Sequence, residues 1–225
     1  NVGVDAKLLN SRLNFTGEYY VKNTKDILLA VPVPLEYGFG KPNMNIGQVR
    51  NKGWELSLGW NDRINDFGYS ISANLSDNRN EVVDLGDTGP WKSSTTYTEV
   101  GLPFNSIYGY ESMGLFQSDE EVAEAPFQNS KTGAGDIRYK NQNGDDKIDA
   151  NDRVVLGDPN PHFLYGLNLS FDYKNFDLGI FFQGIGQQDR IVKDNFIRPL
   201  YDATFFEHQL DYWSPQNTNA KYPRI

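Results

Sequence analysis

The feature that most constrains this chain is a strict alternation of apolar and polar residues. In "GWELSLGWN", residues 53–61, every second side chain is large and apolar, and the residues between are Gly, Glu, Ser and Asn. The apolar positions are Trp54, Leu56, Leu58 and Trp60. Because side chains on an extended strand point to opposite faces in turn, this pattern predicts a β-strand with one apolar and one polar face.

The alternation returns in pairs of stretches joined by short polar turns, and each pair predicts an antiparallel hairpin. The paired stretches are 2–8 with 13–21, 53–61 with 67–76, and 163–173 with 176–182. Much longer connections, near 23–50, 78–162 and 185–225, separate or follow the hairpins. We therefore expect about six strands, arranged as three hairpins with short turns at one end and long loops at the other.

A membrane barrel and a soluble half-buried sheet both contain such strands, and three observations favour the barrel. Aromatic residues lie near both ends of the apolar faces, as in Trp54 with Trp60 and Tyr165 with Tyr173. At about 3.3 Å per residue and a tilt near 40°, these pairs are separated by roughly 15–20 Å in height. The composition agrees, because apolar residues make up only 38% of the chain while aromatic residues reach 14%. Short turns opposite long loops are also typical of outer-membrane barrels.

Charge and composition exclude several other classes of protein. The net charge of −9 argues against nucleic-acid binding, since no basic stripe is present to neutralise phosphates. The absence of cysteine excludes disulfides and thiolate metal sites in this chain. The apolar run Ile27–Leu35 is interrupted by Pro32 and Pro34, so we expect no transmembrane helix.

One stretch, "NQNGDDKIDAND" at 141–152, has the spacing of a calcium-binding loop. Such loops place oxygen ligands at positions 1, 3, 5, 7, 9 and 12. The predicted ligands are Asn141, Asn143, Asp145, the carbonyl of Lys147, Asp149 and Asp152. The alternative is a solvated turn in which Asn and Asp side chains hydrogen-bond their own backbone. Either way, the expected role is structural, with Ca²⁺ as the candidate ion.

No arrangement of residues indicates an enzyme. His162 and His208 lie in different predicted loops without a recognisable motif around either. The acidic residues 119–124 are better explained as the first turn of a short solvated helix with Ser118 as its N-cap. Aromatic residues of the long connections are candidates for contact with substrate or partner, because sugar rings and peptides both pack on flat aromatic faces. These candidates are Trp91, Tyr97, Tyr108, Tyr110 and Trp213.

Several motifs in the right order resemble the SusC/RagA family of TonB-dependent outer-membrane transporters. "TKDILLAVPVP" followed by "NIGQVRNKGWELSLGW" resembles a strand, loop and strand of that family. "GDIRYKNQNGDDKIDANDRVVLGDPNPHFLYG" resembles its Asp-x-Asn-Gly-Asp-Gly-x-Ile-Asp segment, with departures at Asn141 and Asp146. "DYWSPQNTNAKYPRI" resembles its Tyr-Trp-x-Pro-x-Asn-x-x-Ala-x-Tyr-Pro-Arg motif.

The resemblance implies an all-β fold: residues 1–225 would form part of a 22-stranded antiparallel transmembrane barrel, from its C-terminal half, with extracellular loops and no plug domain. It implies TonB-driven import of oligosaccharides or peptides together with a SusD-like surface lipoprotein. The TonB complex would make its contact through a region outside these residues, and lipid would surround the strands. Two alternatives stay open: a passive outer-membrane barrel or adhesin, and a soluble calcium-stabilised glycan-binding β-domain.

Overall fold

The computed structural model describes residues 1–225 except 32, 34, 35, 37, 39, 41, 87, 194, 195, 198 and 200–204. The chain folds into two compact units. Unit 1 comprises Asn1–Ser106 and Asp158–Asp189, and unit 2 comprises Ile107–Gly157 and Arg190–Ile225.

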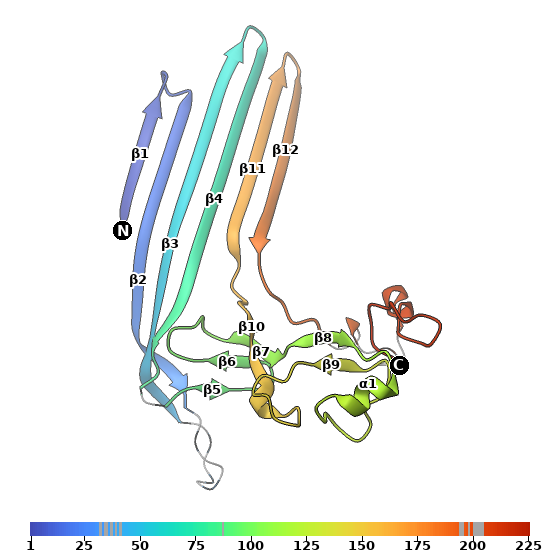
Figure 1. The fold of residues 1–225 in the computed structure, drawn as a ribbon. Helices are drawn as coiled ribbons and strands as arrows, with labels where there is room; N and C mark the ends of the chain where they lie inside the picture. Colours follow the sequence, from blue (N-terminus) through green and yellow to red (C-terminus); the bar gives the residue numbers. More distant parts are fainter. Residues whose placement is uncertain are drawn as a thin grey trace. The chain divides into compact units, whose positions relative to one another are not determined.

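Unit 1 is built on a six-stranded antiparallel sheet with the order β1-β2-β3-β4-β11-β12 (Figure 1). The strands are β1 (Val2–Leu8), β2 (Leu13–Ala30), β3 (Asn43–Ile64), β4 (Phe67–Asp84), β11 (His162–Tyr173) and β12 (Phe176–Gln187). The all-β, antiparallel fold expected from the alternation is confirmed.

Tight turns join the strands within each of the last two hairpins. Ile64 pairs with Phe67 and Tyr173 with Phe176, so only two residues form each turn. Asn65 and Lys174 adopt left-handed φ angles of 54° and 53° there, as two-residue hairpin turns require. The polar dipeptides between the apolar runs therefore set the register of both hairpins.

The strands of the first two hairpins extend well beyond their apolar stretches. The connection expected over 23–50 is shorter, because β2 continues to Ala30 and β3 begins at Asn43. Polar residues such as Asn23 and Arg50 occupy positions of the apolar face in these extensions, so the alternation is interrupted while the backbone ladder continues. A bulge near Asp26, whose φ is 55°, interrupts the register before Ile27.

The remaining elements of unit 1 lie in the connection after β4. Here β5 (Trp91–Lys92) pairs with β6 (Thr96–Thr98). The backbone of Val82 exchanges hydrogen bonds with Gly101 and Leu102, which occupy the edge of β4 beyond its pairing with β11. Val82 is fully buried and belongs, with Leu85, to a small apolar core at this end of the sheet.

Unit 2 consists of short elements. They are β7 (Ser106–Tyr110, whose first residue lies in unit 1), β8 (Ser112–Leu115), α1 (Asp119–Glu124), β9 (Ile137–Tyr139), a 3₁₀ turn at Ala150–Asp152, β10 (Arg153–Gly157) and a second 3₁₀ turn at Glu207–Leu210. The predicted cap of α1 is confirmed, since the Ser118 hydroxyl accepts a hydrogen bond from the backbone N–H of Glu121. No helix in the described part of the chain is long and apolar enough to span a membrane.

The C-terminal motif packs against the glycine-rich turn before β9. Trp213 is buried over Gly135, whose φ is +89° and where a Cβ would lie 2.3 Å from the indole ring. Arg224 donates two hydrogen bonds to the Asp136 carboxylate, at 2.9 and 2.8 Å, and its backbone N–H bonds the Gly135 carbonyl. The aromatic and basic residues of this motif therefore hold unit 2 together.

Candidate membrane-facing surface and loop sites

The register of the sheet joins the apolar positions of all six strands into continuous rows. One row runs through Ala6, Phe15, Leu58, Ala73, Leu167 and Phe182, and the next through Leu8, Leu13, Trp60, Ile71, Leu169 and Ile180. Many of these large side chains are exposed, including Leu58 at 49% and Phe182 at 53% of their surface. An apolar face of this extent is the mark of contact with an apolar medium or partner.

The opposite face of the same sheet is polar. One row across it contains Asp5, Thr16, Ser57, Asn74, Gly166 and Gln183. Glu18 lies directly opposite Glu55 on this face, and both residues border a cavity of about 340 Å³ whose lining also includes Thr, Ser, Asn and two Leu residues. Apolar residues do occur here on the last two strands, among them Phe181. A sheet with one lipid-compatible face and one hydrogen-bonding face has the design of a membrane-barrel wall.

The candidate calcium loop is held by its own backbone. The side-chain oxygens of Asn141, Asn143 and Asp145 accept hydrogen bonds from the N–H groups of residues 144, 145 and 147. Asp152 is fully buried and its carboxylate accepts the N–H groups of residues 142 and 149 at 2.8 and 2.7 Å. The side-chain oxygens thus form Asx turns with the loop backbone. Carboxylate and amide oxygens are also the kind of ligand that Ca²⁺ requires.

An ion pair also involves this loop. The Lys147 ammonium lies 2.7 Å from the Asp149 carboxylate. That contact raises the pKa of Lys147 and lowers the pKa of Asp149, in each case chiefly through the hydrogen bond between the two side chains. Within the described part of the chain, no group of three or more His, Cys, Asp or Glu side chains is arranged to hold a metal ion. Calcium binding at 141–152 stays a prediction.

The five aromatic candidates lie in different environments. In unit 1, the Trp91 indole donates hydrogen bonds to Thr88, and the Lys92 ammonium lies over the ring of Tyr97. In unit 2, Tyr108 is buried with the Arg153 guanidinium 4.3 Å from its ring centre.

Tyr110 and Trp213 also make contacts within unit 2. Tyr110 packs against Tyr139 with their ring centres 5.1 Å apart, and buried Trp213 donates to the side chain of Gln117 at 3.3 Å. Tyr108 and Trp213 are therefore the least accessible of the five.

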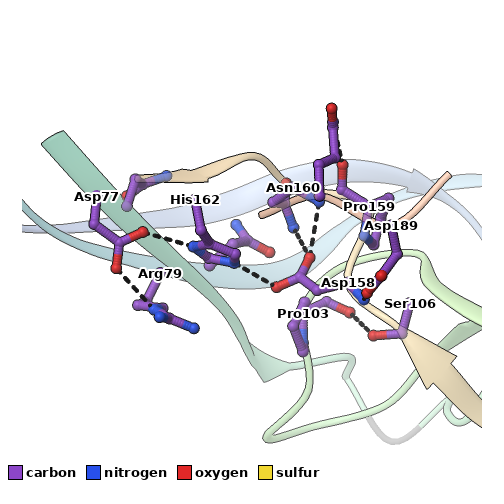
Figure 2. A network of polar contacts seen from close by, with 12 residues as sticks. Asp77, Arg79, Pro103, Ser106, Asp158, Pro159, Asn160, His162 and Asp189 are labelled. Carbon is purple, nitrogen blue, oxygen red and sulfur yellow. Dashed lines mark hydrogen bonds and ion pairs between the residues drawn. The ribbon is translucent and has the colours of Figure 1, made fainter. Parts of the chain in front are cut away.

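A buried polar cluster, which no sequence pattern marks, lies where β11 separates from β4 (Figure 2). His162 is only 1% exposed, with Nδ1 2.6 Å from Asp77 Oδ1 and Nε2 3.0 Å from Asp158 Oδ2. Arg79 donates from Nε to the other Asp77 oxygen at 2.9 Å. We call Asp77, His162 and Asp158 the histidine clamp. Each ring nitrogen therefore lies within hydrogen-bonding distance of a carboxylate oxygen, one from β4 and one from the turn before β11.

Asp158 forms further contacts that hold the start of β11. Burial alone would raise the pKa of its carboxyl, but hydrogen bonds from the Asn160 backbone N–H, the imidazole and the Asn160 side chain outweigh burial, and the net pKa is lowered. Its backbone N–H donates to Asp189 at 2.8 Å, which joins the segment after β12 to the same cluster. The clamp thus secures the end of the long connection between β4 and β11 at the sheet.

Comparison with known proteins places this fold in a family. The model of the TonB-dependent receptor-like β-barrel matches residues 1–183. TonB-dependent receptor P26 of Formosa agariphila is 32% identical over 237 residues, covering 100% of this chain and 24% of the relative. TonB-dependent receptor SusC of Bacteroides thetaiotaomicron is 28% identical over 193 residues, covering 79% of this chain and 18% of the relative. The chain therefore spans about a quarter or less of the length of these relatives.

A solved structure has the same fold. The RagAB peptide importer in its open-open state superposes with a TM-score of 0.75 at 24% identity, covering 99% of this chain and 24% of that chain. These relatives are receptors and transporters rather than enzymes. With the two-faced antiparallel sheet and the match over residues 1–183, we conclude that the chain belongs to the TonB-dependent receptor family of outer-membrane β-barrels and is SusC- and RagA-like.

Proposed function

We propose that this chain forms part of the wall and outer rim of a barrel that imports oligosaccharides or peptides, driven by TonB and assisted by a SusD-like surface lipoprotein. Residues 1–225 would belong to one barrel domain of a longer protein. The observation that carries the proposal is the two-faced sheet, whose exposed apolar rows suit lipid and whose polar rows suit a hydrated lumen.

The proposal also assigns an orientation. The two-residue turns at 65–66 and 174–175 would face the periplasm, and the long connections would face the exterior. This arrangement follows the usual asymmetry of outer-membrane barrels, in which short turns are periplasmic and long loops extracellular. The elements of unit 2 would then lie on the side from which substrate and lipoprotein approach.

The two classes of substrate are supported by different observations. A face of hydroxyl, amide and carboxylate groups suits the many hydroxyls of an oligosaccharide, while a relative of the same fold is a peptide importer. Calcium is a further part of the proposal: Ca²⁺ bound by 141–152 would stabilise the loop and take no part in transport. The half-buried aromatic residues Trp91, Tyr97 and Tyr110 would contact substrate or partner through the parts of their rings that remain accessible.

Uptake by cells that express the full-length protein tests this function. We expect labelled oligosaccharides or oligopeptides to accumulate only when the transporter, TonB and the proton gradient are all present. Competition between the two classes of unlabelled compound identifies the substrate. Uptake that persists without TonB would contradict active import and indicate a passive barrel. A SusD-like lipoprotein should co-purify with the transporter, and its absence from the purified complex would contradict the proposed partnership.

A further inference from the structure

Two cations lie directly opposite each other on the outward face of the sheet. Lys52 on β3 pairs in register with Arg79 on β4, and Val21 on β2 is the neighbour of Lys52 on its other side. Like charges directly opposite across a sheet destabilise it. The Asp77 carboxylate offsets part of the charge of Arg79, and an anion outside the chain would lower the repulsion that remains between Arg79 and Lys52.

A third cation lies one row further along the same face. Arg50 is paired in register with Glu81, with 3.8 Å between its Nη1 and the carboxylate, and donates from Nε to Asn23 at 2.9 Å. Arg79 donates a hydrogen bond from Nε to the Asp77 carboxylate, and its side chain remains 57% exposed. Lys52 has no ion pair among the residues that the structure describes, and it is exposed. We call Arg50, Lys52 and Arg79 the basic rim.

The basic rim begins where the apolar face ends. In the next row towards the two-residue turns, Tyr19 lies opposite Trp54 on the same outward face. The exposed apolar rows lie between this pair and the turns. Aromatic residues with a polar tip are typical of the boundary between hydrocarbon and headgroups. With about 3.3 Å per residue, Lys52 and Arg79 lie some 5 Å beyond that boundary, where lipid headgroups begin.

We propose that the basic rim binds the phosphate of a phosphorylated lipid in the outer leaflet, with the acyl chains lying along the apolar rows. The proposal rests on the orientation assigned under the proposed function. A phosphate between Lys52 and Arg79 accepts charge-assisted hydrogen bonds from both and removes their mutual repulsion. A lipid fits better than a free anion, because the same face continues directly into surface that binds acyl chains.

The test measures lipid binding to the purified full-length protein in detergent by native mass spectrometry. The probes are diphosphoryl lipid A, the same lipid A with its phosphates removed, and inorganic phosphate. Wild-type protein should bind the phosphorylated lipid at least about tenfold more tightly than the dephosphorylated lipid, because loss of even one of the two charge-assisted hydrogen bonds predicts that difference. Lys52→Gln should remove most of this preference, and Lys52→Arg should retain it.

Lys22→Gln is the matched control. Lys22 pairs with Asn51 one position away from Lys52, so its side chain points to the polar face, and the substitution removes the same charge. The preference should survive in this variant. Equal binding of both lipids by the wild type, an unchanged preference in Lys52→Gln, or an equal loss in Lys22→Gln would each overturn the proposal. Displacement of the lipid by inorganic phosphate alone would also overturn it. A protein that transports normally but shows no lipid preference would refute only the basic rim.

Discussion

His162 is the clearest example of a side chain whose role depends on residues far away in sequence. Its partner Asp77 is 85 positions away along the chain, and its second partner Asp158 is in the turn before β11. Removing the ring takes a hydrogen-bond partner from the buried Asp77 carboxylate and from Asp158, and a lost hydrogen bond at a buried polar group costs about 1–3 kcal/mol. The clamp should therefore dominate the local stability of the segment that enters β11.

Substitution of His162 tests this role in the full-length protein. We expect His162→Gln to accelerate amide hydrogen exchange at 158–164 strongly, because glutamine carries both N–H donors on one nitrogen and its amide oxygen cannot donate to a carboxylate. His208→Gln is the control, since His208 lies in the other unit and bonds the Phe196 carbonyl. Equal exchange at 158–164 in wild type and His162→Gln would contradict the clamp.

The clamp should also respond to acid. Asp158 has a lowered pKa in the folded chain, so its contribution to stability is fully present above its unfolded pKa and is lost as the pH falls through the folded value. Protection of 158–164 should therefore persist at neutral pH and decrease below about pH 4. In Asp158→Asn this acid-dependent decrease should be smaller, and an unchanged profile in that variant would contradict the assignment.

Two glycines with positive φ make a second test at residue scale. Gly135→Ala places a methyl group against the Trp213 ring, whereas the space around Gly144, with φ of +77°, is open. We expect Gly135→Ala to destabilise unit 2 by about 1–3 kcal/mol more than Gly144→Ala, because overpacking adds to the shared backbone strain. Equal shifts in the thermal unfolding of the two variants would show that the Trp213 contact contributes nothing.

For single residues, contacts with near neighbours in sequence could be predicted, whereas contacts between residues far apart in sequence could not. The sequence predicts Ser118 as a helix cap because the cap and the N–H group that donates to it are only three residues apart, and the structure confirms it. Trp213 was a candidate for ligand contact, yet it is buried, because an aromatic residue in a long loop carries no local sign of what covers it. The histidine clamp escaped prediction for the same reason, since register between distant strands brings it together.

At the scale of elements, the period-two pattern predicted the strands but not their ends. The hairpins follow directly from alternating faces and two-residue turns. In the extensions of β2 to Ala30 and of β3 from Asn43, polar residues such as Arg50 interrupt the apolar face, so no continuous alternation marks them. Their stability comes from backbone pairing and from polar contacts between neighbouring strands. For example, the side-chain amides of Asn78 and Asn80 donate hydrogen bonds to the side-chain oxygen of Asn51.

A charged substitution should impair membrane assembly on one face of β3 and not on the other. We expect Leu58→Arg to reduce assembly of the full-length protein in the outer membrane, since an arginine near the bilayer centre costs about 2–4 kcal/mol. Ser57→Arg, on the polar face, should assemble close to normally. The amount of heat-modifiable folded protein on gels measures both, and equal assembly of the two variants would contradict the facing.

The loop 141–152 makes a prediction of its own. Calorimetric titration of the full-length protein should show weak calcium binding, with a dissociation constant on the order of 10⁻⁴–10⁻³ M, as expected for sites of few charged ligands. Asp145→Ala should abolish the heat because it removes a predicted carboxylate ligand. If the wild type gives no heat, or Asp145→Ala binds as well, the loop is an Asx-rich turn without a metal.

At the scale of the whole molecule, the role of the sheet as a membrane wall depends on what the apolar rows touch. The rows cross all six strands without a break and leave side chains such as Leu58 half exposed. Family membership was predictable because motifs spread along the chain resemble the family in the right order. Substrate was not, because specificity depends on lumen and loop geometry across a barrel of which this chain forms only a part.

Spin labelling along β3 of the full-length protein in lipid bilayers tests this claim most directly. Nitroxides placed singly at Leu56, Ser57 and Leu58 are measured for collision with oxygen, which concentrates in hydrocarbon, and with a water-soluble nickel complex. The account predicts high oxygen accessibility at Leu56 and Leu58 and high nickel accessibility at Ser57. Labels at Leu56 and Leu58 that neither reagent reaches would place these residues inside a protein core and contradict it.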